Sequence, residues 1–296
     1  MHVLQSCCGH FLTRCYSSSG KFAVAAVCGM PAVVKLADGA LCNHISSAAQ
    51  ILKSGGIVAL PTDTLYGLAG LAQHATAVHD IYKVKCRNQA KPLAVCVAQV
   101  EDIYKWAEVT VPRELLVSLL PGPVTLIFKR TKALNKELNP ETELVGIRIP
   151  DSDFIRKVTF ACGAPLALTS ANISNQQSPL EVEEFKELWP EVAGIFDGGR
   201  IKPDFLDDTS DETYPSLENE ILSNIVLRSA ARDPNKYHNK LTLSEDQKVR
   251  TIRNPSREGS TVVDLSVEGF FKIVRQGIAL HNTVNVLNTR GLKLLL

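Results

Sequence analysis

The stretch ALPTDTLYGLAG, residues 59–70, places a group of polar side chains directly after a short apolar run. Residues 57–60 have the length and composition of a buried strand, which Pro61 ends. Thr62, Asp63 and Thr64 follow. Because Asp and Thr side chains hydrogen-bond readily to nearby backbone groups, they can close a turn, and at a strand end they can equally hold a ligand. The stretch alone leaves both interpretations open.

Helix-like and strand-like segments alternate on both sides of this stretch. Upstream, the S-x-x-Q pattern of residues 47–50 resembles a capping box, which predicts a helix ending at residues 55–56. Downstream, SPLE at residues 178–181 is typical of a helix start, and that helix should run to about Trp189. Further helices are predicted over residues 75–85 and 111–120, and strands over 93–97, 124–128, 144–150, 165–172, 259–266 and 270–277. This order predicts an α/β fold with a mixed sheet.

The composition is that of an ordinary folded protein. The chain has 296 residues, a hydrophobic share of 45% and a formal net charge of +1, so its charge gives no support to a chain coated in nucleic acid. No apolar run approaches the roughly 20 residues that a membrane-spanning helix needs, so no integral membrane segment is expected. The eight cysteines show no C-x-x-C pair with a matching second half. This predicts reduced thiols in an intracellular protein rather than a disulfide framework or a zinc site.

Composition also divides the chain. Residues 1–40 are interpreted as a targeting-like or disordered N-terminus, because the first 37 residues combine three basic residues and a serine run with no acid. That is the composition of a mitochondrial presequence, so a cytoplasmic and a mitochondrial location are both expected. Residues 41–280 are expected to form one domain, interrupted at 201–258 by a polar, disordered insertion with a single helical stripe at 221–231. Residues 281–296 are left as a C-terminal tail.

Several standard catalytic motifs are absent from the sequence. It contains no glycine-rich phosphate loop of either common type, no H-E-x-x-H metal motif and no G-x-S-x-G nucleophile motif. The seven histidines are scattered, so neither a metal cluster nor a Ser-His pair is suggested. A nucleotide site in this chain must therefore be built from side chains.

The stretch KVKCRNQAKPL, residues 83–93, carries the cations Lys85, Arg87 and Lys91. Lys85 continues the apolar face of the predicted helix, whereas Arg87 lies about 200° further round an ideal helix. Both can point one way only if the helix breaks, which Asn88-Gln89 permits. A break would gather three cations suited to a polyphosphate. An ordinary basic helix end, favoured by the helix dipole, is the alternative.

Arg148 stands in the strand LVGIRIP, residues 144–150, on the face opposite to its apolar neighbours. A guanidinium in so apolar a strand is costly unless it has an anionic partner or reaches water. Arg148 is therefore either half of a buried structural ion pair or a group that binds a ligand carboxylate or phosphate.

Hydroxyl and amide side chains gather at the end of another predicted strand, where Thr169, Ser170 and Asn172 follow one another closely. They offer neutral donors and acceptors where α/β proteins often bind a ligand, although an N-cap-like turn would use the same residues. Ser260 and Arg275 add the same pattern to the last two strands. Together these residues predict a polar, cationic cleft in an α/β domain.

Six motifs occur here in the order in which one known family has them: PTDTLYGL, K-x-R with KPL, LPGPVTL, VGIRIP, LTSAN and GSTVVDL. On these motifs the chain resembles the YrdC family over roughly residues 41–200 and 259–280. The resemblance implies a single YrdC-like catalytic domain, a twisted mixed sheet with flanking helices and an open basic cavity. It also implies a nucleotidyltransferase reaction, in which L-threonine, bicarbonate and ATP give L-threonylcarbamoyladenylate and pyrophosphate.

The resemblance assigns the candidate residues to two ligands, with Arg148 clamping the threonine carboxylate. The set expected to bind threonine is Thr62, Tyr66, Arg148, Thr169 and Ser260. The set expected to bind ATP is Lys85, Arg87, Lys91, Ser170, Asn172 and Arg275. Mg2+ would accompany ATP, although no metal ligand is identified in the chain. No residue is expected to act as a covalent nucleophile.

The resemblance also implies partners. The product would pass to a separate transferase, of the KEOPS type or its mitochondrial counterpart, which modifies adenosine 37 of tRNAs that read codons starting with A. The chain itself would contact tRNA only indirectly or weakly. Longer family members have a second domain whose linker helps to close the site, so closure here is expected to come from elsewhere.

Two alternative functions stay open at this point. One is a non-enzymatic module of the same fold that binds double-stranded RNA or tRNA. The other is a related carbamoyl-adenylate enzyme like the hydrogenase-maturation carbamoyltransferases. Those enzymes carry additional acylphosphatase and zinc-finger domains, which this sequence does not contain.

Overall fold

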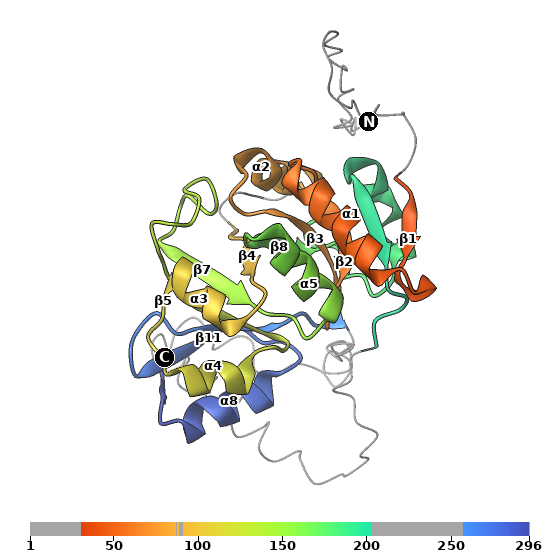
Figure 1. Cartoon of the computed structure of the whole chain (residues 1–296). Coiled ribbons are helices and arrows are strands. Elements are labelled where there is room, and N and C mark those ends of the chain that lie inside the picture. Colours follow the sequence, from red (N-terminus) through yellow and green to blue (C-terminus); the bar gives the residue numbers. More distant parts are fainter. Residues whose placement is uncertain (1–30, 87, 89–90, 203–256, 296) are drawn as a thin grey trace, which may run out of the picture. The chain divides into compact units, whose positions relative to one another are not determined.

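The structure, a computed structural model, describes residues 31–86, 88, 91–202 and 257–295. Arg87, residues 1–30 of the presequence-like N-terminus and nearly all of the expected insertion, with its helical stripe, lie outside the described residues. Within the described part, strands and helices alternate along the chain (Figure 1). The α/β class expected from the sequence is confirmed.

The strands form one mixed sheet. Among the described residues it has 12 strands, in the order β1-β9-β2-β3-β8-β4-β7-β6-β10-β11-β12, with β5 paired to β6. Parallel pairs such as β10 with β6 lie beside antiparallel pairs such as β2 with β3, as the sequence predicts. The strands are β1 Val33–Lys35, β2 Val58–Pro61, β3 Tyr66–Leu71, β4 Ala94–Cys96, β5 Ala107–Glu108, β6 Val124–Arg130, β7 Leu144–Arg148, β8 Leu166–Ser170, β9 Gly194–Asp197, β10 Thr261–Asp264, β11 Phe270–Arg275 and β12 Lys293–Leu294.

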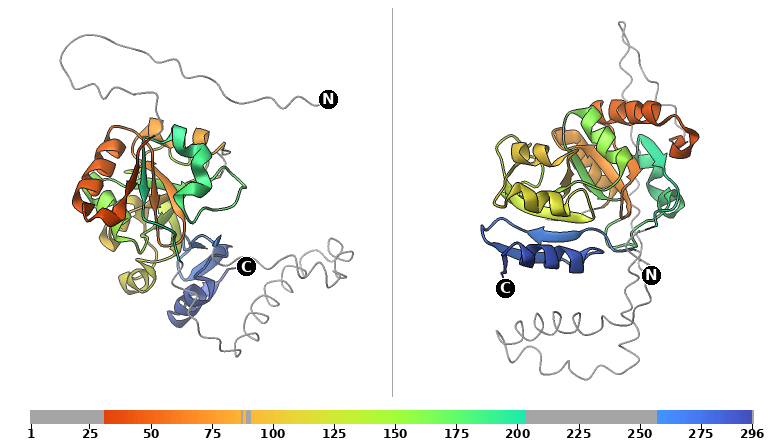
Figure 2. Two further views of the ribbon diagram at one scale, coloured as in Figure 1. Left: turned by 90° about the vertical axis from the view of Figure 1, so that its right-hand side faces the viewer. Right: turned by 60° about the horizontal axis from the view of Figure 1, so that its bottom comes forward.

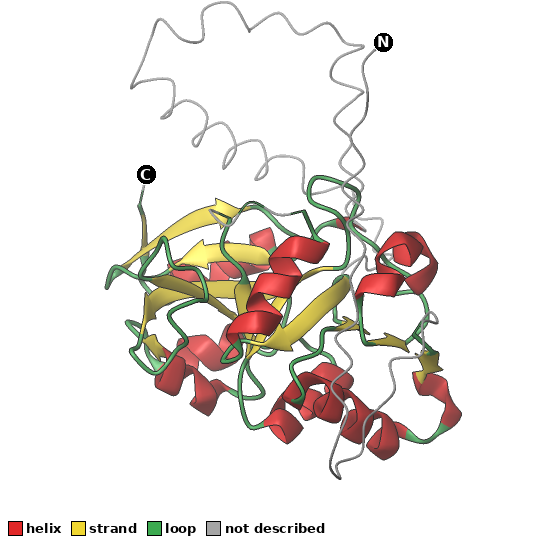
Figure 3. Ribbon diagram, turned by 90° about the horizontal axis from the view of Figure 1, so that it is seen from above, coloured by secondary structure: helices red, strands yellow, loops and turns green. Residues whose placement is uncertain are grey.

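Helices flank the sheet on both sides (Figure 3). The α-helices are α1 Leu41–Lys53, α2 Ala75–Val84, α3 Val100–Trp106, α4 Arg113–Leu119, α5 Asp153–Cys162 and α8 Leu280–Thr289, and the 3-10 segments are η1 Leu36–Asp38 and η2 Val182–Glu191. The predicted helix at 111–120 is α4, in which Pro112 is the N-cap rather than the first helical residue.

Two apolar clusters fill the space on the two faces of the sheet. On one face, α1 and α5 pack side by side (Figure 1) and bury residues such as Leu52 and Ile155 against the strands. On the other face, residues of α2, α3 and α4 form the larger cluster. Successive strand residues alternate between the two, since Leu60 belongs to the first cluster and Ala59 to the second. Side chains that share a face can therefore be read from the strand register.

Helix α1 begins six positions before the capping box expected at Ser47. Its N-cap is Ala40, whose side chain makes no cap hydrogen bond. The helix is extended toward its N-terminus because Leu41 and Ile45 continue the apolar stripe and pack on the core. Burial of this stripe outweighs the local capping signal.

The helix expected from residue 178 is not an α-helix. The segment instead forms η2, a 3-10 segment with a break at Phe185. The Pro179 carbonyl accepts a hydrogen bond from the Tyr66 backbone N–H at the start of β3, at 3.0 Å. Where the α-helix was expected to begin, the backbone is instead hydrogen-bonded to β3. A local sequence pattern cannot reveal such a contact between distant residues.

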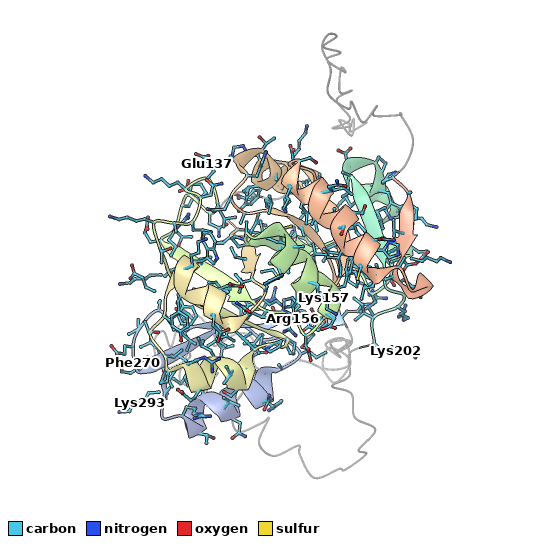
Figure 4. All side chains as sticks on the ribbon, in the orientation of Figure 1. Glu137, Arg156, Lys157, Lys202, Phe270 and Lys293 are labelled. Carbon is cyan, nitrogen blue, oxygen red and sulfur yellow. The ribbon has the colours of Figure 1, made fainter. Side chains whose placement is uncertain are left out.

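The C-terminal residues belong to the fold. β10 lies parallel to β6, and β11 and β12 continue the sheet beyond it, with α8 beside α4 (Figures 1 and 2). Phe270 on β11 lies opposite Lys293 on β12, and both are labelled in Figure 4. The segment expected as a tail therefore contains α8 and β12. At the other end, β1 pairs with β9, so the folded part begins before residue 41.

Candidate functional site

The turn between β2 and β3 is closed by the side chain of Thr62. Its hydroxyl donates to the Leu65 carbonyl at 2.7 Å and accepts the backbone N–H groups of Thr64 and Leu65, each at 3.2 Å. The Thr62 N–H also donates to the Leu65 carbonyl, at 3.2 Å. The turn interpretation is thus confirmed for Thr62, and its contact with threonine stays a prediction.

Arg148 forms a buried ion pair with Asp63 of the same turn. Its Nη2 donates to Asp63 Oδ1 and, at 2.8 Å, to the Thr64 hydroxyl. The side chains of Arg148 and Asp63 are only 9% and 7% exposed. The second Asp63 oxygen accepts the backbone N–H of Asp151 at 3.1 Å. The structural ion pair proposed as one reading of Arg148 therefore exists, and Asp63 and Thr64, left by the sequence as turn residues, are its partners.

The same guanidinium also has an unused donor. Arg148 Nε is buried and has no hydrogen-bond partner among the described residues. A buried N–H without a partner is costly, so it marks a place where a ligand oxygen would be stabilising. The ion pair and a role in ligand binding are therefore compatible.

Ser260 and Arg275 lie on the same sheet face as Arg148. The register places Thr125 opposite Arg148, and Val262 opposite both Thr125 and Arg275. The hydroxyls of Ser260 and Thr125 are 2.7 Å apart, and Arg275 Nη2 donates to the Ser260 carbonyl at 2.8 Å and to its hydroxyl at 3.1 Å. The structure thus brings together Arg148, Ser260 and Arg275 of the predicted set.

Two glycines allow this close packing. A Cβ at Gly259 would lie 3.2 Å from Arg275 Nη2 and 3.5 Å from a Leu65 methyl group, so this segment lies against the Thr62 turn. A Cβ at Gly277 would lie 2.4 Å from the Gly259 carbonyl oxygen. Gly277 therefore has to be glycine for the chain to pass the backbone that carries Ser260, and sequence reasoning missed it.

Lys85 is joined to the segment that follows β8. The helix ends at Val84, and Cys86 has a positive φ of 47°, so the break expected in this stretch is present and lies before Asn88. The Lys85 side chain is directed inward, and the residue is 1% exposed. Its ammonium donates to the carbonyls of Ser170 at 2.5 Å and Asn172 at 2.6 Å.

These contacts change the interpretation of the cation cluster. Lys85 holds the LTSAN segment, whereas Lys91 is exposed and donates to the Asn175 side chain at 3.3 Å. Arg87 lies outside the described residues. The Ser170 hydroxyl donates to the Asn172 side-chain oxygen, and the Asn172 amide donates to the Gln176 carbonyl at 2.7 Å. The ATP contacts of these residues stay predictions.

Tyr66 and Thr169 are directed away from Arg148. Tyr66 is fully buried, and its hydroxyl lies 2.7 Å from the Gly199 carbonyl and accepts the Gly198 N–H at 2.9 Å. Burial raises the pKa of this phenol. Thr169 is opposite Leu68, on the sheet face away from Arg148, whereas Ser170 is on the Arg148 face. The structure gives Tyr66 a structural role, and the threonine contacts of both residues stay predictions.

Cys96 lies opposite Arg148 in the register of β4 and β7. Burial raises the pKa of its thiol to about 12, so the thiol is protonated at neutral pH. A protonated buried thiol is a poor nucleophile. Cys42, Cys86 and Cys162 are also free thiols.

Glu184 on η2 holds the chain at both borders of the undescribed segment 203–256. It forms a two-bonded ion pair with Arg257, with both distances 2.7 Å, and lies 3.8 Å from Arg200. The Arg257 hydrogen bonds lower the pKa of Glu184 from 4.5 to about 2. Arg257 is three residues before Ser260, so this pair fixes the chain that leads into the site.

The part of the chain that the structure describes contains no candidate metal cluster and no candidate membrane helix. No group of three His, Cys, Asp or Glu side chains that could hold a metal ion occurs in that part of the chain. None of its helices has the length and apolar character needed to cross a membrane.

Known proteins match this chain in sequence over more than half of its length. The family model Sua5_yciO_yrdC, described as "Telomere recombination", matches residues 50–209. Threonylcarbamoyl-AMP synthase of Mus musculus is 44% identical over 246 residues, which span 83% of this chain and 71% of the relative.

Solved structures show the same fold. The P. abyssi Sua5 structure, complexed with L-threonine, has a TM-score of 0.61 at 23% identity and covers 85% of this chain and 58% of its own. E. coli YciO also has a TM-score of 0.61, at 18% identity, over 84% of this chain and 97% of its own.

Proposed function

Since the chain belongs to the Sua5/YciO/YrdC family, we propose that it makes L-threonylcarbamoyladenylate and pyrophosphate from L-threonine, bicarbonate and ATP. The observation that carries the proposal is the 44% identity to a relative of that activity, over 83% of this chain. The site supports it, because Asp63 holds Arg148 and Lys85 is bonded to Asn172, so that the residues proposed for the two substrates form two ordered groups.

Arg148 and Ser260, with the residues that hold them, are proposed to bind threonine. A guanidinium with a buried, unpartnered Nε–H is suited to a carboxylate, and the Ser260 hydroxyl is fixed on the same sheet face by Thr125 and Arg275. Hydroxyl groups held in this way can orient a small polar amino acid. Thr62 shapes the turn that carries Asp63 toward Arg148.

The cations of the stretch 85–91, together with the segment that follows β8, are proposed to bind ATP. Lys85 fixes the backbone of Ser170 and Asn172, so its part is to position that segment, while Arg87 and Lys91 are proposed to meet the phosphates. Arg275, which donates to the Ser260 carbonyl, is proposed to contact the nucleotide. Mg2+ is proposed to enter with ATP and to neutralise phosphate charge there.

In this reaction the protein positions the substrates and does not supply a nucleophile. The threonine amine forms a carbamate with bicarbonate, which releases water, or with CO2, which releases a proton. A carbamate oxygen then attacks the α-phosphorus as pyrophosphate leaves. The attacking group is thus part of the substrate, and the protonated state of the Cys96 thiol accords with this route. Cationic side chains would stabilise the charge that develops on the phosphate.

The product is proposed to pass to a KEOPS-type or mitochondrial transferase for threonylcarbamoylation of adenosine 37 in tRNA. Both the cytoplasmic and the mitochondrial location remain proposals that rest on the composition of residues 1–40. A purely RNA-binding module is not favoured. RNA binding would not need a buried guanidinium paired with an acid beside ordered hydroxyl groups.

A pyrophosphate-release assay tests the proposal. The purified full-length chain should release pyrophosphate from ATP only when L-threonine and bicarbonate are both present, and serine should be a poor substitute. Equal release with serine, or release without bicarbonate, would remove the substrate assignment.

A further inference from the structure

Arg148 already uses hydrogen atoms that a ligand carboxylate would need for two parallel hydrogen bonds. A guanidinium binds a carboxylate with two parallel N–H groups, either from Nε and Nη2 or from Nη1 and Nη2. Nη2 belongs to both edges, and here it donates to Asp63 and to Thr64. The Nε–H is buried without a partner. A ligand carboxylate can therefore gain two bonds only by taking a hydrogen of Nη2 from one of these acceptors.

Of the two acceptors of Nη2, Asp63 is the charged one, so losing its hydrogen bond to Arg148 has the larger electrostatic consequence. Its carboxylate is 7% exposed and has the Arg148 guanidinium as its ion-pair partner. A buried carboxylate left without a cation is strongly destabilising, so a ligand that brings only a negative charge would strand Asp63. An amino acid brings a carboxylate and an ammonium group together, one for each member of the pair.

We propose that Asp63 and Arg148 form an exchange site for a zwitterion: the ligand carboxylate replaces Asp63 on Arg148, and the released Asp63 carboxylate receives the ligand ammonium. One internal ion pair is replaced by two with the ligand, and the site stays electrically neutral. The inference rests on the proposed function, because threonine is the ligand, and it adds the residue that recognises the amino end.

The surroundings of Asp63 suit such an exchange. Its other oxygen is held by the Asp151 backbone N–H at 3.1 Å, and the turn that carries it is closed by Thr62. These bonds limit how far the carboxylate can move when it leaves Arg148. Thr64 still accepts from Nη2 at 2.8 Å, so the guanidinium keeps one fixed contact during the exchange.

Calorimetric titration of the full-length chain tests the proposal. Two probes are used: L-threonine, and 3-hydroxybutanoate, which is threonine with hydrogen in place of the amino group. The variant is Asp63→Asn. Asp151→Asn is the matched control, because it removes a neighbouring exposed carboxylate and leaves the backbone N–H in place.

We expect the wild type to bind threonine at least about 30-fold more tightly than 3-hydroxybutanoate. Asp63→Asn should weaken threonine by about 30-fold and leave 3-hydroxybutanoate unchanged or bound more tightly, so that the ratio falls toward one. Asp151→Asn should change neither affinity.

Other outcomes would overturn the inference. If Asp63→Asn weakens both probes equally, Asp63 only holds Arg148 in place, and if it tightens threonine, Asp63 is only an internal competitor. If Asp63→Asn is unfolded at the assay temperature, the test rests on the ratio of the wild-type affinities for threonine and 3-hydroxybutanoate. Equal binding of the two probes by the wild type rejects the exchange. A wild type that binds no threonine rejects the proposed function itself, and this inference with it.

Discussion

The Lys85 ammonium lies 2.6 Å from the backbone carbonyl oxygen of Asn172, and this contact joins two motifs that are 87 positions apart in the sequence. The same ammonium donates to the Ser170 carbonyl at 2.5 Å. A cation that the sequence suggested for phosphate binding is thus fastened to the backbone of the neighbouring segment. The two motifs act as one structural unit.

Replacing Lys85 should therefore cost stability as well as activity. We expect Lys85→Met to lower the free energy of unfolding by about 2 to 4 kcal/mol, because the buried carbonyl groups lose a charged donor. Chemical denaturation would measure the loss. Lys53→Met, at the exposed last turn of α1, is the control and should change the stability little. A fully stable Lys85→Met protein would show that these bonds are not needed for the fold.

The Ser260 hydroxyl should contribute more to threonine binding than the Thr125 hydroxyl, which is hydrogen-bonded to it. Ser260→Ala removes the group proposed to meet the substrate, and we expect the threonine KM to rise about tenfold. Thr125→Val removes only its partner at 2.7 Å and should raise the KM less than about threefold. Steady-state kinetics with saturating ATP separates the two. The reverse order of effects would assign Ser260 a purely structural role.

Tyr66→Phe should affect stability without affecting substrate use. The variant leaves the Gly198 N–H and the Gly199 carbonyl without their hydroxyl partner, which should cost about 1 to 2 kcal/mol. Denaturation and threonine kinetics are the two measurements. An unchanged stability together with a raised threonine KM would restore Tyr66 as a wall of the threonine pocket.

Glu184 should make a contribution to stability that depends on pH. Its pKa is lowered in the folded protein from 4.5 to about 2, so its pairing with Arg257 is fully present above pH 4.5 and is lost as the pH falls toward 2. Glu184→Gln should lower the stability at pH 7 by up to about 1 kcal/mol, since the pair is partly exposed to solvent.

Thermal melting of wild type and Glu184→Gln from pH 7 to pH 2 checks this expectation. The difference between the two proteins should shrink below pH 4.5 and disappear near pH 2. Glu187→Gln, an exposed carboxylate of the same 3-10 segment, serves as the control. A difference that is constant over the whole range would mean that the charge of Glu184 does not stabilise the fold.

The elements of the sheet were predictable because their signals are local. Apolar runs bounded by turn residues predicted β2, β6, β7 and β8, and the six motifs in order predicted the family. Arg148 also stood out, because a guanidinium in an apolar strand demands an explanation. These predictions need no knowledge of which segments meet in space.

The contacts that define the site were not predictable, because they join distant residues. Asp63 and Arg148 are 85 positions apart, and the turn pattern of Asp63 gave no hint of its partner. The 3-10 form of η2 was likewise not predictable, because the Pro179 carbonyl just before it accepts the N–H of the distant Tyr66. Sequence reasoning named the residue types at the site, and tertiary packing decided which of them are engaged in the ion pairs and hydrogen bonds of the fold.

The central claim is tested most directly by following the carbon of bicarbonate. Full-length protein is incubated with ATP, L-threonine and 14C-labelled bicarbonate, and the nucleotides are separated by chromatography. The account predicts a labelled adenylate that contains threonine, formed in step with pyrophosphate and lost when threonine is omitted. Release of pyrophosphate with no label in any adenylate, or labelling that does not need threonine, would contradict it.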